Sequence, residues 1–418
     1  YLTSLHPMTG TIDAYTDQIW RHDVRFIGAG AIAVASVWTL LKLIGPVVRG
    51  VVATMSANRA RVAGTADLRD TDLSPSWIGA LAVACLVVIA WLLFQFLAPT
   101  PLAASSTTLV IAAVPFVFIG GFLIAAICGY MAGLIGASNS PVSGVGILAI
   151  VISATIFVAI MHPPASAQNA LVAYALFATA IVFSIATISN NNLQDLKTGQ
   201  LVGATPRAQQ WALIVGVIAG SAVIPPVLNL LAQAFGFAGA PNLHTVTTHP
   251  LAAPQATLIS ALAQGVISGN LDWQMIGIGA VVGVVLVALN EFLAWRKWLE
   301  LPPLAVGIGI YLPMSATLPV VIGAVIGHFY NVWTRRTKSP EYSRRLAVLI
   351  ASGMIVGESL FGVVLAGLIV AFSSDAPLGL VPADFAWANA IGVVLFVLFI
   401  AGLYAWIMRR ARAFKPAV

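Results

Sequence analysis

The chain has 418 residues, of which 60% are hydrophobic and only 8% carry a formal charge. So little charge cannot cover the surface of a water-soluble protein of this length, and the composition predicts an all-α, polytopic membrane helical bundle. The net charge of +6 arises from basic residues in short stretches between apolar runs. That distribution is typical of cytoplasmic loops in a lipid bilayer and excludes a nucleic-acid partner.

The first 75 residues are predicted to form three sections. Residues 1–23 are polar and form an exposed lead-in, and the first span covers residues 24–43. Residues 45–75 are rich in Arg and are interpreted as a cytoplasmic basic connection, with a surface-lying amphipathic helix over residues 46–61. Because the chain starts at Tyr1 and not at Met, we expect further residues upstream.

Eight further spans follow if the chain alternates across the bilayer, which makes about nine in total. They cover residues 77–98, 109–135, 146–161, 169–188, 211–235, 275–293, 346–372 and 387–408. The polar residues 189–207 are assigned to a cytoplasmic loop, and residues 236–272, which lack Lys and Arg, to an external loop. The basic residues after Met408 place the C-terminus in the cytoplasm.

Residues 303–333 do not fit this alternation, because basic residues precede and follow them. Both ends therefore favour the cytoplasm, and we expect a re-entrant hairpin that enters the bilayer and returns. Pro313 and Pro319 flank residues 314–318, which would form its tip, and Pro313 and Ser315 are candidate substrate-binding or pathway residues. A true span that departs from the charge rule is the alternative. Tyr311, just before the turn, is a candidate pathway residue.

A polar break inside apolar chain marks the stretch from Gly129 to Ile147. A broken segment at bilayer depth must face protein or a watery cavity, so it is a candidate wall of a substrate pathway; a tight surface turn is the alternative. Five residues between Gly136 and Gly144 are the candidates there, namely Ser138, Asn139, Ser140, Pro141 and Ser143.

Two further sets of charged residues are functional candidates. Glu358 lies near the middle of a predicted span, where a carboxylate is costly unless it is protonated or hydrogen-bonded. It is the candidate for proton coupling, and a hydrogen bond that joins two helices through Ser359 is the alternative. Asp195 and Lys197 form a candidate gate or a solvated turn.

The sequence contains no phosphate loop, zinc-protease motif or serine-hydrolase elbow, and an enzyme is not predicted. Cys85 and Cys128 lie in apolar spans and the six His residues are scattered, so neither a disulfide nor a metal site is expected. No cofactor is predicted.

Four motifs together resemble the bacterial branch of the oligopeptide transporter (OPT) superfamily, which is related to the yellow-stripe-like metal-chelate transporters. They span residues 133–144, 191–206, 307–313 and 357–360. The resemblance covers essentially the whole chain and implies a single transporter domain over residues 1–418, the C-terminal two thirds of the family fold, with N-terminal segments missing. It places Ser138 to Gly144 and Gly307 to Pro319, with Pro313, near the pathway.

The resemblance implies secondary active, proton-coupled transport of small oligopeptides, or of metal-siderophore or other metal-chelate complexes. Alternating access around broken helices would carry the substrate across the bilayer. A passive channel and an integral membrane enzyme are the alternatives from other classes. The expected location is a bacterial inner membrane, and a homo-oligomer stays open.

Overall fold

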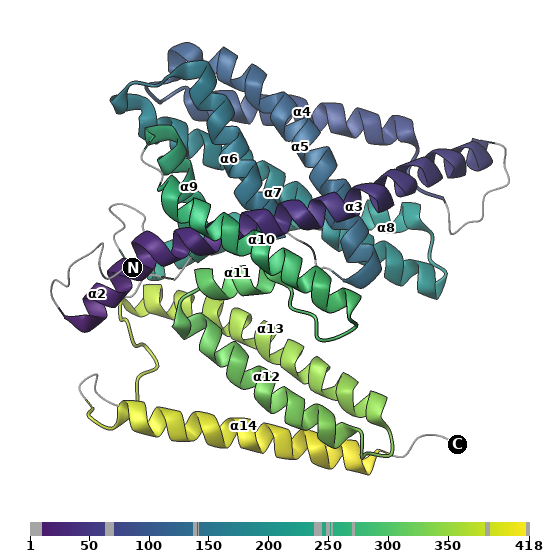
Figure 1. Cartoon of the computed structure of the whole chain (residues 1–418), viewed down its shortest axis with the longest axis vertical. Coiled ribbons are helices and arrows are strands. Elements are labelled where there is room, and N and C mark those ends of the chain that lie inside the picture. The colour runs from purple at the N-terminus through teal and green to yellow at the C-terminus, as the bar shows by residue number, and fades with distance from the viewer. Residues whose placement is uncertain are drawn as a thin grey trace. The chain divides into compact units, whose positions relative to one another are not determined.

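The computed structural model describes residues 11–62, 71–136, 140, 142–237, 245–247, 251, 254–269, 272–380 and 385–414. All the regular secondary structure within these ranges is helical, which confirms the predicted all-α bundle (Figure 1). The N-terminal helices are α2 (Ile12–Ile19), the π-helix η1 (Trp20–Val24), α3 (Arg25–Val62), α4 (Pro75–Leu97), the short η3 (Ala103–Ser105), α5 (Ser106–Ile135), α6 (Val142–Met161) and α7 (Ala165–Val202). They are followed by α8 (Pro206–Ala234), α9 (Pro254–Ser268), α10 (Trp273–Trp295), α11 (Pro303–Tyr311), α12 (Met314–Thr334), α13 (Pro340–Phe372) and α14 (Ala388–Ala413).

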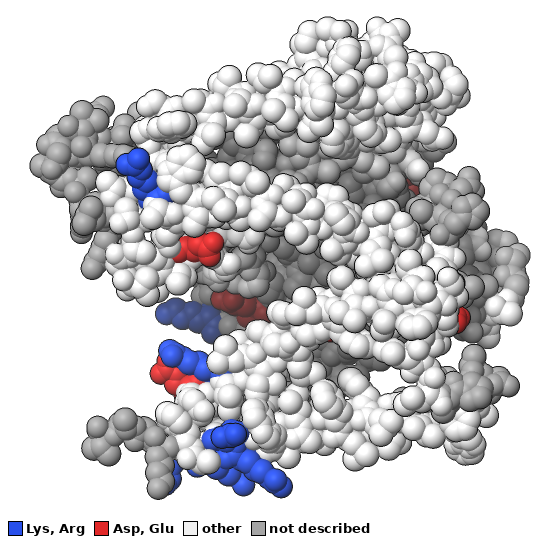
Figure 2. Space-filling view, turned by 180° about the vertical axis from the view of Figure 1, so that it is seen from behind, with Lys and Arg blue, Asp and Glu red and all other residues white. Residues whose placement is uncertain are grey.

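Eight helices of the described ranges are long and apolar enough to cross a membrane, namely α4, α5, α6, α7, α8, α10, α13 and α14. Each coincides with one of the predicted spans. The remaining predicted span lies in α3, whose apolar section covers Arg25–Thr39. Figure 2 shows a face whose described surface is mostly free of acidic and basic side chains, as a lipid-facing surface requires.

Two predicted loops are wrong, because helices occupy them. α7 continues through the predicted loop at 189–207 as far as Val202, and Gly203 then ends the helix with a φ of 79°. Nothing before this glycine breaks the helix, so polar composition alone was misleading. The predicted external loop at 236–272 contains α9, which buries Leu258, Leu262 and Ile267.

The predicted tip of the re-entrant hairpin is also wrong. Residues 314–318 form the first turns of α12, and the helix break falls earlier, at Leu312 and Pro313 between α11 and α12. Proline removes a backbone donor and disfavours a helical conformation in the preceding residue, which explains why the helix stops at Tyr311. Whether residues 303–333 return to the same side of the membrane stays a prediction.

The chain divides into two compact units. The first unit consists of Tyr1–Ala219 and Pro254–Pro313, and the second of Gly220–Ala253 and Met314–Val418. In the first unit α5 packs along α7, α6 packs against α7 and α9, and α3 packs against α10 and α11. In the second unit α13 packs against α12 and α14.

Apolar side chains and a few hydroxyls hold the first unit together. Its main cluster contains Leu93, Leu109, Phe157 and Leu171, none of which exposes measurable surface. Between α6 and α7 the hydroxyls of Ser153 and Thr179 lie 3.0 Å apart in a buried hydrogen bond. Such a bond satisfies two polar groups that lipid cannot solvate.

Small residues bring α3 and α10 into backbone contact. A Cβ atom added to Gly279 would lie 2.0 Å from the carbonyl oxygen of Ile27, and one added to Gly30 would lie 2.2 Å from that of Ile276. Gly283, one turn after Gly279, packs on α3 less tightly, because a Cβ atom there would lie 2.9 Å from the Val34 β-carbon and 3.1 Å from the carbonyl oxygen of Ala31. Glycines four residues apart let membrane helices approach this closely.

The second unit has a smaller core. One buried cluster joins Ala234 at the end of α8 to Ala366 and Ile369 of α13. Its other apolar side chains are largely exposed, including the run from Val393 to Phe399 on α14. The helices of this unit therefore present broad apolar faces to their surroundings.

Candidate functional site

The predicted polar break between α5 and α6 is confirmed. α5 ends at Ile135, Gly136 adopts a φ of 95°, and α6 begins at Val142. Of the candidates in this break, Ser138, Asn139 and Pro141 lie outside the described residues, as does the side chain of Ser143.

Two buried polar atoms lie near this break. The Ser140 hydroxyl lies beside the thiol of Cys128 on α5, and Cys128 packs against Ala186 of α7. One turn after Ala186, the side-chain oxygen of Asn190 is buried. Neither the Asn190 oxygen nor the Ser140 hydroxyl finds a hydrogen-bond acceptor or donor of nitrogen or oxygen within the described part of the chain. Buried polar atoms of this kind mark places for water or a polar ligand.

A cavity of about 330 Å³, here called the Lys197 cavity, adjoins the same helices. Its lining includes Asp72, Gly129, Tyr130, Gly133, Leu193 and Lys197. Gly129 lets Leu193 pack closely in this wall, because a Cβ atom at Gly129 would lie only 3.1 Å from a Leu193 methyl group. The volume falls within the range of small-ligand sites, about 300–1,000 Å³.

Hydrogen bonds from α8 hold two segments next to the Lys197 cavity, the one that carries Asp72 and the end of α7. Gln210 on α8 donates to the Asp72 carboxylate at 2.9 Å and accepts from the backbone nitrogen of Leu73 at 2.8 Å. Gln209 donates to the backbone carbonyl of Asp195 at 2.9 Å, which ties α8 to α7. The lining of the cavity thus includes one acidic and one basic side chain, Asp72 and Lys197, and hydrogen bonds hold the segments that carry them.

The structure gives the two candidate gate residues different surroundings. Lys197 lines the cavity and donates to the Gln200 side chain at 3.0 Å. Asp195 is exposed and is not among the lining residues, although it lies only two positions away on α7. A gate built on these residues stays a prediction.

Tyr311 lies in a second, separate arrangement at the end of α11. The Arg25 guanidinium donates to its hydroxyl at 2.6 Å and lies 5.0 Å from the ring centroids of both Tyr311 and Trp20. Gly28 permits this seating, because a Cβ atom there would lie 2.8 Å from the backbone nitrogen of Tyr311. Arg25 follows directly on the π-helix η1, an element that often occurs at functional sites.

The cavity beside Tyr311 is small. It has a volume of about 30 Å³ and is lined by residues such as Ile147, Phe183 and Leu258. This volume accommodates about one water molecule, so no peptide fits there in this conformation. Ile147, the last residue of the broken stretch, reaches this second cavity, whereas Gly129 and Gly133 reach the first.

The remaining candidates lie elsewhere. Glu358 is exposed on α13, and the hydroxyl of Ser359 bonds to the carbonyl of Ile355 on its own helix. Pro313 is half-buried after α11, and the side chain of Ser315 lies outside the described residues. The proton-coupling role of Glu358 stays a prediction.

Sequence reasoning missed Arg25, Asp72 and Asn190. Arg25 stands at the very start of the predicted first span, next to the charged end of the lead-in, so nothing in the sequence distinguishes it from an ordinary residue at the membrane surface. Asp72 stands in polar sequence, and nothing there indicates that it lines the same cavity as Lys197.

In the described ranges no three His, Cys, Asp or Glu side chains gather closely enough to hold a metal ion.

The eight long apolar helices of the described ranges define an integral membrane protein of the polytopic helical class. Residues 7–369 match the family model described as "OPT oligopeptide transporter protein". The chain belongs to this family, which confirms the resemblance seen in the sequence motifs.

Three relatives illustrate the range of the family. A Haemophilus influenzae protein named "Putative oligopeptide transporter" is 39% identical over 414 residues, covering 95% of this chain and 65% of the relative. A Saccharomyces cerevisiae protein, "Putative oligopeptide transporter YGL114W", is 25% identical over 54% of this chain and 29% of its own length. The Arabidopsis thaliana "Probable metal-nicotianamine transporter YSL8" is 28% identical over 44% of this chain and 25% of its own length.

The chain therefore spans just under two thirds of the Haemophilus relative and smaller shares of the other two. No solved structure matches it.

Proposed function

We propose that the complete protein is a secondary active, proton-coupled carrier of small oligopeptides in a bacterial inner membrane, with its C-terminus in the cytoplasm. The observation that carries the proposal is the Lys197 cavity, which offers a carboxylate and an ammonium group within one space of about 330 Å³. A peptide carries the complementary charges, with an ammonium group at one end and a carboxylate at the other. Asp72 would bind the first and Lys197 the second.

Membership of the family and the name of the Haemophilus relative support peptide transport. Basic residues favour a cytoplasmic position for this cavity, since Lys197 lines it and Arg207 follows the lining residue Pro206. The cavity then acts as the inner vestibule of an alternating-access pathway, and the closed Tyr311 cavity lies further along the same broken stretch.

Uptake of a metal chelate by the same mechanism is the second candidate. The similarity to proteins named as metal-nicotianamine transporters favours it. A chelator built from amino acids also carries amine and carboxylate groups, so the same two side chains would recognise it.

Competition in proteoliposomes that hold the complete protein tests the proposal. Unmodified dipeptides should compete with a labelled dipeptide. Dipeptides with one blocked terminus should compete about tenfold less well, the loss for one charged contact, and dipeptides with both termini blocked about a hundredfold less well. Lys197→Gln and Asp72→Asn should each raise the apparent KM about tenfold, and Glu341→Gln, at an exposed position of α13 that does not line the cavity, should leave it unchanged. Equal competition by blocked peptides would exclude the assigned roles of Asp72 and Lys197, and preference for iron chelates would favour the second candidate.

Proton coupling is tested separately at Glu358. Wild-type vesicles should acidify when dipeptide enters, and Glu358→Gln should abolish this acidification while exchange of labelled for unlabelled dipeptide continues. Normal acidification by Glu358→Gln would remove this residue from the mechanism. Exchange without any proton movement in the wild type would point to a passive carrier.

A further inference from the structure

An open groove runs between α3 and α10 of the first unit. It has a volume of about 510 Å³, and its wall is formed by apolar side chains, among them Val34, Val37, Leu41 and Val284. Leu41 and Val284 expose more than half of their surface, so the groove opens outward. The lining positions on α3 run from Ala33 to Leu41, or about 12 Å along the helix axis.

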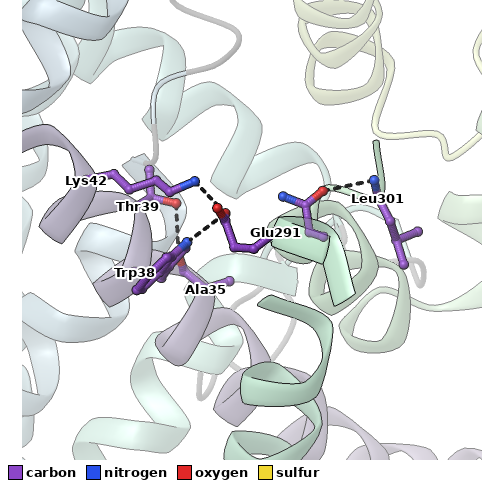
Figure 3. A network of polar contacts seen from close by, with 7 residues as sticks. Ala35, Trp38, Thr39, Lys42, Glu291 and Leu301 are labelled. Carbon is purple, nitrogen blue, oxygen red and sulfur yellow. Dashed lines mark hydrogen bonds and ion pairs between the residues drawn. The ribbon is translucent and has the colours of Figure 1, made fainter. Parts of the chain in front are cut away.

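One end of this groove carries a compact polar cluster. Figure 3 shows Lys42 and Trp38 of α3 pointing toward Glu291 of α10. The Lys42 ammonium contacts the Glu291 carboxylate, and the Trp38 indole donates to the same oxygen at 3.2 Å. The Lys42 and Glu291 side chains keep 52% and 37% of their surface exposed, so both can contact a further ligand.

Exposed aromatic and basic side chains place this cluster at the level of the lipid headgroups. Trp295, one turn after Glu291, is 74% exposed, and the Arg296 guanidinium lies 5.3 Å from its ring centroid. Trp298 is also exposed. Tryptophan beside basic residues at the end of an apolar helix is typical of the membrane–water interface.

We propose that the groove binds one phosphatidylethanolamine molecule. One acyl chain fills the apolar groove, the phosphate pairs with Lys42, and the primary ammonium donates to Glu291. The two charges of this headgroup complement the two charges of the cluster. A phosphatidylglycerol headgroup lacks the ammonium, and the quaternary amine of phosphatidylcholine has no N–H to donate, so the site should prefer phosphatidylethanolamine to both.

Quenching of Trp38 fluorescence by lipids with brominated acyl chains tests the proposal in the complete protein. The Trp38 signal is the difference between the wild type and Trp38→Phe. Brominated phosphatidylethanolamine should quench it at about tenfold lower concentration than the other two lipids, the ratio expected for one charged hydrogen bond.

Variants show which residues bind the lipid. Ala288→Phe fills the groove and should abolish the preferential quenching, whereas Val281→Phe, on an exposed part of α10 outside the groove, should retain it. Glu291→Gln should make phosphatidylethanolamine and phosphatidylglycerol equivalent, and Lys42→Gln should weaken both.

Three results would overturn the proposal. They are equal quenching by all three lipids in the wild type, no quenching because another part of the complete protein or a second copy covers the groove, and unchanged preference in Ala288→Phe.

Discussion

The two units use the same spacing of glycines in different ways. In the first unit Gly279 and Gly283 meet the backbone of α3 or its β-carbons, and no side chain would fit at either position. In the second unit Gly353 and Gly357 have the same separation on α13, yet no described atom lies within 4 Å of a Cβ built on either. The comparison teaches that four-residue spacing permits close packing but does not identify the helix that uses it.

Substituting one glycine of each unit tests this comparison with the largest expected effect. Gly279→Val should lower the free energy of unfolding by about 3 kcal/mol, because α3 and α10 must separate to admit the side chain. Gly353→Val should change it by less than about 1 kcal/mol, a size typical of helix propensity alone. Thermal unfolding of both variants of the complete protein in detergent measures the difference.

An equal loss of stability in Gly353→Val would show that Gly353 is as tightly packed as Gly279. It would mean that a segment absent from this chain, or a second molecule, packs on α13 in the complete protein. Normal stability of Gly279→Val would instead show that the α3–α10 crossing opens readily.

Removing one tyrosine hydroxyl from each unit compares polar contacts in the two units and should change stability by a smaller amount. Tyr311→Phe removes a hydrogen bond from the Arg25 guanidinium and should cost about 2 kcal/mol of stability, as expected for a bond to a charged group. Tyr330→Phe in the second unit removes a neutral bond of 2.8 Å to the carbonyl of Ser343 and should cost about 1 kcal/mol. Equal costs would show that water solvates the Arg25 charge.

The smallest effect is expected at the exposed ion pair between Glu341 and Arg345 on α13. Its side chains keep 79% and 75% of their surface exposed, and Glu341→Gln should change the free energy of unfolding by less than about 0.5 kcal/mol. Adding salt should not increase this difference. A change above 1 kcal/mol would reveal a contact that the described residues do not make.

The apolar spans could be predicted from sequence because hydrophobic length alone defines them. The two loops that proved helical show the limit of this approach. α9 has only 15 residues, and the section of α7 after residue 188 is polar, so neither segment contains an apolar run of full membrane length. In α9 the apolar periodicity, visible at Leu258 and Leu262, was the informative signal.

The candidate site could be predicted only in part. The break after Gly136 was evident, because several polar residues and a proline interrupt an apolar run. Its neighbours were not, since the approach of Asp72 to Lys197 depends on how α7 and α8 pack at their ends. A single sequence contains no direct signal for such long-range contacts.

The crossing of α3 and α10 also limits how the protein can move. Where backbone touches backbone at Gly30 and Gly279, no side chain is present whose rotation could absorb sliding of one helix along the other. We therefore expect a displacement of α10 to carry α3 with it. If the complete protein changes conformation, the two helices should move together, and the rearrangement should take place where this pair meets its neighbours.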